Sequence, residues 1–121
     1  MDGVYGGTSQ ERRTHLRVTA ELEVEYELPG STPRPARVVD IGLGGTRLRT
    51  LDPPPAGAPI TVLARLPGAQ YPSRLAATVR WTRGEHFGVA FGVLPARDTL
   101  LIVDLMRANL RSRPPRALEP A

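Results

Sequence analysis

The sequence contains no cysteine and only two histidines. Without cysteine the chain can form neither disulfides nor thiolate metal sites, and His15 and His86 are too far apart in sequence to suggest a zinc site. We therefore expect no bound metal. Lysine is also absent, so all 16 basic residues are arginines and the net charge is +4. This arginine bias, with the abundance of alanine, glycine and proline, is typical of GC-rich genomes, so basicity alone is weak support for a nucleic-acid partner.

Long apolar runs and aromatic residues are scarce as well. No run approaches the roughly 20 apolar residues of a membrane span, and the first residues lack the basic and then apolar pattern of a signal peptide. These absences predict a cytoplasmic protein with no membrane contact. The few aromatic side chains, one Trp, three Tyr and two Phe, argue against a stacking surface for single-stranded nucleic acid.

The segment from Leu16 to Leu28 alternates apolar and polar residues without a break. This two-residue period is typical of a strand with one face in the core and one in water, and Leu16 begins its inward phase. The alternating glutamates then form a solvated strand face. Pro29, Gly30 and Pro33 follow and predict a turn.

Five shorter segments repeat this period between turns rich in proline and glycine. After Pro95 the spacing changes, because Leu101, Leu105 and Ala108 recur as on one face of a helix, with Leu110 among the flanking residues. The pattern predicts an all-β domain with a C-terminal helix: a six-stranded antiparallel barrel whose helix closes one mouth. The shorter strands are expected at residues 36–41, 46–51, 60–66, 75–82 and 87–93.

The ends of the chain differ in composition from this domain. Residues 1–10 are polar and glycine-rich, and residues 112–121 are rich in proline and arginine. Neither segment has enough apolar side chains to fold alone. We expect one domain at residues 11–111, a flexible segment before it and a disordered tail after it.

Two short motifs stand apart from the strand pattern: an arginine-rich segment with Arg12, Arg13 and Arg17, and a glycine-rich loop from Asp40 to Gly45. Taken singly, such arginines are more often surface charge, and such glycines more often a turn. Together they resemble the PilZ family of cyclic di-GMP receptors. That family has an RxxxR motif on an N-terminal arm and a D/N-x-S-x-x-G motif in a six-stranded barrel. Arg13 and Arg17 match the first motif, Arg12 matches an arginine that often precedes it, and Asp40 and Gly45 match the second; the resemblance covers residues 11–110.

The chemistry of these residues suits a guanine nucleotide. An arginine guanidinium can donate two parallel hydrogen bonds to O6 and N7 of guanine, can stack on the base, or can bind a phosphate. Asp40 can accept from the guanine N1 and N2 hydrogens. Gly44 and Gly45 remove side chains where the loop turns and where a flat base would approach the backbone.

Two positions leave alternatives open. Gly42 stands where the family has serine, which removes about one hydrogen bond, worth roughly 0.5–1.5 kcal/mol. Binding would then be about tenfold weaker, unless water fills the space left by the hydroxyl. Trp81 falls on the inward phase of the fifth strand, which favours core or rim packing over a stacking role against guanine.

The sequence therefore predicts a receptor rather than an enzyme, because it has no catalytic elbow and no phosphate-binding loop. We expect cyclic di-GMP, as one molecule or as an intercalated dimer, to order the arginine arm and so signal to an unidentified effector protein. The alternative is a PilZ-like interaction adaptor that has lost nucleotide binding. The expected binding residues are Arg12, Arg13, Arg17, Asp40, Gly42, Gly44, Gly45 and Trp81.

Overall fold

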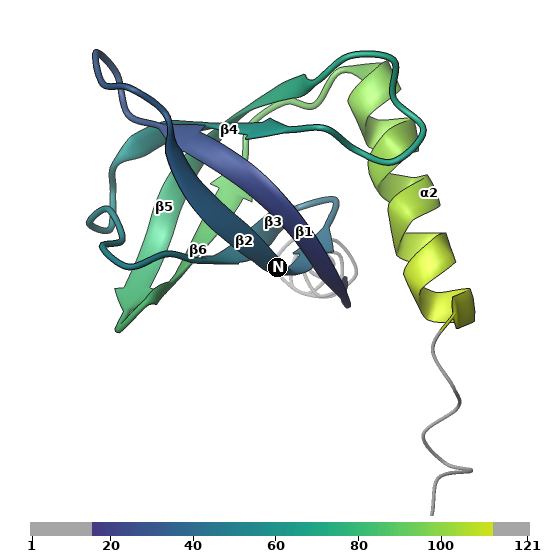
Figure 1. Cartoon of the computed structure of the whole chain (residues 1–121), viewed down its shortest axis with the longest axis horizontal. Coiled ribbons are helices and arrows are strands. Elements are labelled where there is room, and N and C mark those ends of the chain that lie inside the picture. The colour runs from purple at the N-terminus through teal and green to yellow at the C-terminus, as the bar shows by residue number, and fades with distance from the viewer. Residues whose placement is uncertain (1–15, 113–121) are drawn as a thin grey trace, which may run out of the picture.

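The period-two segments form six strands in the computed structural model, which describes residues 16–112 (Figure 1). One helix follows the last strand. Prolines and glycines fill the connections, and Gly30, Gly57, Gly68 and Gly84 adopt positive φ angles there. The elements are β1 (Arg17–Glu27), β2 (Arg34–Gly42), β3 (Gly45–Arg49), β4 (Pro59–Ala64), β5 (Ser73–Arg83), β6 (His86–Phe91) and α2 (Ala96–Ser112).

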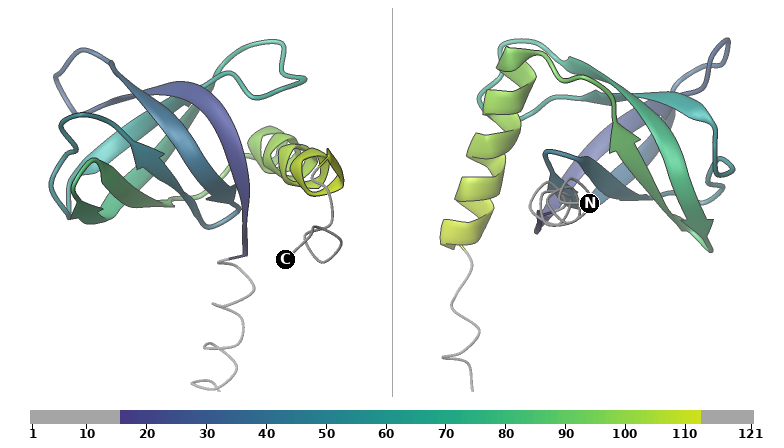
Figure 2. Two further views of the ribbon diagram at one scale, coloured as in Figure 1. Left: turned by 60° about the horizontal axis from the view of Figure 1, so that its bottom comes forward. Right: turned by 180° about the vertical axis from the view of Figure 1, so that it is seen from behind.

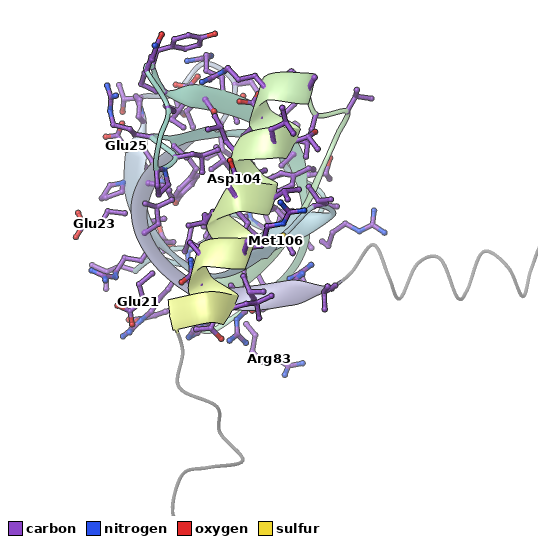
Figure 3. The ribbon with its side chains drawn as sticks, turned by 90° about the vertical axis from the view of Figure 1, so that its right-hand side faces the viewer. Glu21, Glu23, Glu25, Arg83, Asp104 and Met106 are labelled. Carbon is purple, nitrogen blue, oxygen red and sulfur yellow. The ribbon has the colours of Figure 1, made fainter. Side chains whose placement is uncertain are left out.

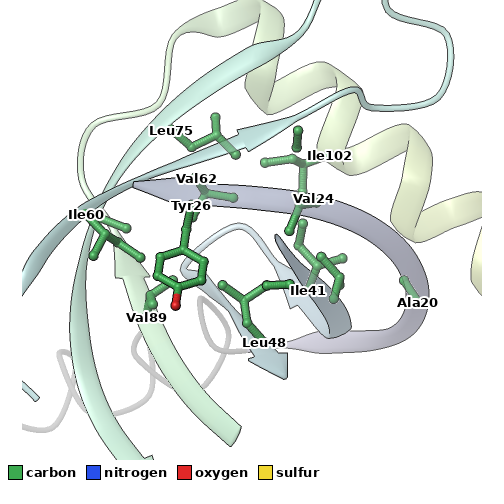
Figure 4. Packing of buried hydrophobic residues seen from close by; sticks show 14 of the residues in the cluster. Ala20, Val24, Tyr26, Ile41, Leu48, Ile60, Val62, Leu75, Val89 and Ile102 are labelled. Atoms are coloured by element: carbon green, nitrogen blue, oxygen red, sulfur yellow. The ribbon is translucent and has the colours of Figure 1, made fainter. Parts of the chain in front are cut away.

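The strands close into a barrel in the order β1-β2-β3-β6-β5-β4, with every neighbouring pair antiparallel. Alternate side chains of each strand point inward and form a single core. Tyr26 and Phe87 meet in this core edge to face, with their ring centroids 5.4 Å apart, and Figure 4 shows Tyr26 among aliphatic neighbours such as Ile60, Val89 and Leu48. The predicted six-stranded antiparallel barrel is confirmed.

Helix α2 lies outside the ring of strands, as both views in Figure 2 show, and packs against β1 and β2. Ile102 and Leu105 are buried in the core and hold it there. Seen from its own side, α2 crosses in front of the barrel (Figure 3), which agrees with the predicted closure of one mouth. The sequence placed Ala108 on the apolar face of this helix, with Leu110 beside it. That prediction was wrong for the end of the helix, because both residues are exposed. No helix in the described part of the chain is long and apolar enough to span a bilayer.

Two strand residues depart from the predicted alternation. Leu16 was expected to point into the core, but it precedes β1 and is 61% exposed. Trp81 was expected on the inward phase of β5, but it is 38% exposed. The β5–β6 pairing shifts its register between Val79 and Trp81, and such an irregularity moves the following side chains to the other face. The predicted segment 1–10 and nearly all of the predicted tail lie outside the described residues, so both stay predictions.

Candidate functional site

Asp40 lies between two arginines on the outer surface of the barrel. Its Oδ1 is 3.4 Å from Nη1 of Arg17 on β1, and its Oδ2 is 3.4 Å from Nε of Arg47 on β3. The contact with Arg17 has hydrogen-bond geometry, whereas Nε of Arg47 makes no hydrogen bond within the described residues. Asp40 and Arg17 are both partly buried. The structure thus brings together one residue from each predicted motif.

The backbone around Asp40 is held by an irregular stretch of the β2–β3 pairing. The register shifts between Val38 and Asp40, and this shift sets Asp40 opposite Arg47. The buried Thr46 hydroxyl donates a 2.7 Å hydrogen bond to the Asp40 carbonyl oxygen. A hydrogen bond between a buried side chain and the backbone fixes such a bulge in one geometry. The backbone that carries the Asp40 carboxylate is therefore anchored to β3.

Gly42 is buried under the chain segment that leads into β1. Arg17 pairs with Gly42 across the two strands, and a Cβ at position 42 would overlap the Leu16 carbonyl oxygen and lie 3.1 Å from Cγ of Arg17. The expectation that water could take the place of the family's serine hydroxyl was wrong. The backbone of Leu16 and the stem of Arg17 already fill that space, so Gly42 allows Arg17 to approach β2 closely.

Glycine at position 45 allows β3 to lie close to the backbone of β6. A Cβ at this position would overlap the carbonyl oxygen of Val89 on the neighbouring strand β6. Neither Gly44 nor Gly45 has a positive φ angle, so the chain passes from β2 to β3 here without the left-handed conformation that favours glycine. The Gly44 carbonyl accepts a 2.9 Å hydrogen bond from the Phe91 amide. This bond ties the loop to β6 beside the site.

Trp81 lies on the outer surface, with its indole ring over Gly88. A Cβ at position 88 would overlap the indole Nε1, so glycine at this position allows the ring to lie against the backbone of β6. Gly88 pairs with Arg47 on one side and with Trp81 on the other. A row of outward positions therefore runs across four strands, from Asp40 through Arg47 and Gly88 to Trp81.

A hollow of about 300 Å³ lies beside this row. This volume is at the lower end of the range of small-molecule sites, about 300–1000 Å³. Residues from three strands, β1, β5 and β6, and one loop line it. Arg80 among them has no ion pair within the described residues. The lining residues are Arg17, Gly44, Arg80, Trp81 and residues 88–90.

A model of the PilZ domain matches residues 11–108. The chain belongs to the PilZ domain family. A comparison with curated proteins gives no match.

Several solved structures have the same fold. The PilZ domain of CeSA from a cellulose-synthesising bacterium is 17% identical with a TM-score of 0.62, over 77% of this chain and 96% of that one. The Bacillus subtilis inhibitor of motility (MotI/DgrA) is 20% identical with a TM-score of 0.65, over 82% and 52%. The Borreliella burgdorferi PlzA protein in complex with c-di-GMP is 14% identical with a TM-score of 0.63, over 85% and 44%. The chain therefore spans about half of the last two proteins.

The PilZ motif residues fall into two groups. Arg17, at the start of β1, and the Asp40-to-Gly45 loop surround one site, whereas Arg12 and Arg13 lie outside the described residues. Arg80 also lines the candidate site and Arg47 contacts Asp40 beside it, and sequence reasoning missed both. Their signal was the outward phase of their strands, which places Arg47 two residues after Gly45 and Arg80 next to Trp81.

A larger hollow of about 660 Å³ lies over β1 and β4. Glu23 and Glu25 line it together with Arg65 and Arg74. Carboxylates repel the phosphates of a nucleotide at close range. Volume alone would favour this hollow, but charge favours the smaller one beside Arg17.

Proposed function

We propose that this PilZ domain is a receptor for cyclic di-GMP and that the ligand binds at the hollow beside Arg17. The observation that carries the proposal is the meeting of Arg17 and Asp40, residues 23 positions apart in sequence, at 3.4 Å. One donates to the Hoogsteen edge of guanine and the other accepts from its N1 and N2 hydrogens. PlzA, a protein of the same fold, has been solved with c-di-GMP.

The hollow supplies further groups that suit the ligand. Trp81 offers a half-exposed ring on which a base can stack, and stacking on an aromatic side chain is worth about 1–3 kcal/mol per base. Arg80 offers a guanidinium for a phosphodiester. Because the hollow is small, we expect Arg12 and Arg13 to complete the site by covering the ligand from the N-terminal side. The bound form is one molecule or an intercalated dimer.

We further propose that binding signals through the segment that contains Arg12, Arg13 and Arg17. The ligand bridges this segment to Asp40 and Gly45, and the resulting arrangement creates or hides a surface for an effector protein. Such a switch is limited by the difference between the ligand's affinities for the two arrangements. On this proposal the domain acts by binding in the cytoplasm and not by catalysis.

Titration calorimetry with purified protein and cyclic di-GMP tests the binding proposal. We expect saturable heat for the wild type and at least a tenfold weaker affinity for Arg17→Ala, because a hydrogen bond to a charged group contributes about 1.5–3 kcal/mol. Arg34→Ala is the matched control, since Arg34 is an exposed arginine at the far end of β2. Absence of heat at high micromolar ligand would reject the proposal.

A second candidate function is an interaction adaptor that does not bind nucleotide. The observation that favours it is the mutual neutralisation of Arg17 and Asp40, together with the occupied space above Gly42. An adaptor of this kind would show the same amide spectrum for β1 with and without cyclic di-GMP. A partner protein would also bind Arg17→Ala as tightly as the wild type.

A further inference from the structure

Helix α2 carries a second apolar stripe on the side turned away from the barrel. Leu100 is 65% exposed and Leu110 is 57% exposed, and Val103 lies between them on the same face. Ile102 and Leu105, which bury α2 against the strands, lie on the opposite side of the helix. Figure 3 views the molecule from this outer side, where no described segment covers α2. Two exposed leucines and a valine in one line are unusual on a helix that faces only water.

The spacing of this stripe is typical of a helix that pairs with another helix. Ala96, Leu100, Val103, Arg107 and Leu110 follow one another at intervals of four, three, four and three residues. This heptad spacing keeps side chains along the line of contact between two packed helices. The barrel-facing residues Ile102 and Leu105 fall outside this set, so α2 can contact the barrel and a second helix at the same time.

The charges along the stripe indicate which helix it would meet. Asp104 and Arg107 are both exposed, and neither forms an ion pair with the described residues. These two opposite charges lie close together on the helix, so two copies of the helix in antiparallel orientation have matching charges. An antiparallel second copy would bring a positive charge to each negative one.

We propose that this face of α2 pairs two copies of the chain around a twofold axis. Leu100 of one copy packs opposite Leu110 of the other, and Val103 packs opposite Arg107. In this register Asp104 of each copy borders the guanidinium of Arg107 in the other copy, which gives two equivalent ion pairs. A contact of this kind has the same surface patch on both partners.

The pairing is weak, because the stripe spans only two heptads. A contact of this length buries less than the roughly 800 Å² per partner of a standard interface. We expect a dissociation constant of about 10–1000 µM. The hollow beside Arg17 has no residue in this face, so dimerisation does not depend on the proposed nucleotide binding.

Sedimentation velocity of the full chain without nucleotide, from about 1 µM to about 1 mM protein, tests the proposal. We expect the sedimentation coefficient to rise with concentration from the monomer to the dimer value. Leu100→Glu should raise the dissociation constant by more than about tenfold. Leu51→Glu is the matched control, because Leu51 is an exposed leucine in a loop and its loss should leave dimerisation unchanged.

Charge exchange tests the antiparallel register. Asp104→Arg alone brings two arginines together at each ion pair, and Arg107→Asp alone brings two carboxylates together, so each variant should be monomeric. An equimolar mixture of the two variants restores opposite charges and should dimerise. A wild type that stays monomeric up to about 1 mM, equal loss in Leu51→Glu, or a mixture that does not dimerise would each overturn the proposal.

Discussion

Replacing Gly42 with serine restores the residue of the PilZ motif, yet we expect it to weaken binding of cyclic di-GMP. The reason lies in what covers Gly42. A Cβ at this position overlaps the Leu16 carbonyl oxygen and lies 3.1 Å from Cγ of Arg17. The segment that leads into β1 must therefore move away from β2, and Arg17 moves with it.

The magnitude follows from two opposed effects. Forcing extra atoms into a closely packed position costs about 1–3 kcal/mol. The free variant relieves this strain by moving Arg17 away from β2, and the ligand must bring Arg17 back, so binding bears the cost. A serine hydroxyl that reaches the ligand returns about 0.5–1.5 kcal/mol. Taking about 2 kcal/mol for the cost and about 1 kcal/mol for the return leaves a net loss of about 1 kcal/mol, or about fivefold in affinity.

Gly42→Ala separates the two effects, because alanine adds the Cβ without the hydroxyl. We expect it to bind about thirtyfold more weakly than the wild type, from the full cost of about 2 kcal/mol. Titration calorimetry should thus rank the affinities as wild type, then G42S, then G42A. Tighter binding by G42S with unchanged binding by G42A would refute the reasoning, since the space above Gly42 would then be free. Amide spectra without ligand should show Arg17 displaced in both variants.

Three further substitutions test other parts of the molecule. Arg47→Gln removes one of the two cations beside Asp40, and calorimetry should show an affinity reduced by at most about fivefold, because a partly exposed ion pair contributes about 0–1 kcal/mol. Trp81 is the only tryptophan, so its fluorescence should change on binding, and Trp81→Ala should lower affinity at least about fivefold if a base stacks on it. Ser73→Ala removes the 2.5 Å hydrogen bond to the buried Asp98 carboxylate and should cost about 1–3 kcal/mol in urea unfolding, whereas the exposed Ser31→Ala should not.

The barrel could be predicted because its signal is local. A strand with one face in the core needs apolar residues at every second position, and Val18, Val24 and Tyr26 satisfy this need within one segment. The helix could also be predicted, because the spacing of the apolar residues changes after Pro95. Neither prediction depends on which strands lie next to each other in the barrel.

The parts that could not be predicted depend on contacts between strands. The prediction that Trp81 points inward was wrong because the register shifts just before it, in the pairing of β5 with β6. The alternation of residues within β5 alone gives no sign of that shift. Arg47 was missed because only the β2–β3 register sets it opposite Asp40. Gly42 was predicted to leave space at the position of the motif serine, and Gly45 to lie where the loop turns, yet at each position a Cβ would meet a backbone oxygen from another strand or segment.

Arg17→Lys tests whether Arg17 contacts guanine through two parallel hydrogen bonds. Lysine keeps a positive charge beside Asp40, so the ion pair and the β1–β2 pairing should survive, and the amide spectrum without ligand should change little. It cannot donate two parallel hydrogen bonds to one edge of guanine, and such a bidentate contact is worth about 1–3 kcal/mol of recognition.

A receptor should therefore lose about tenfold or more in affinity for cyclic di-GMP with Arg17→Lys, and more still with Arg17→Ala. The Arg17–Asp40 contact does not prevent such binding, because a partly exposed ion pair contributes only about 0–1 kcal/mol. Each of the two residues can instead form a hydrogen bond with the ligand, and a hydrogen bond to a charged group contributes about 1.5–3 kcal/mol. Unchanged calorimetric affinity in Arg17→Lys would mean that Arg17 acts on the ligand only as a point charge, and the guanine contact assigned to it would be wrong.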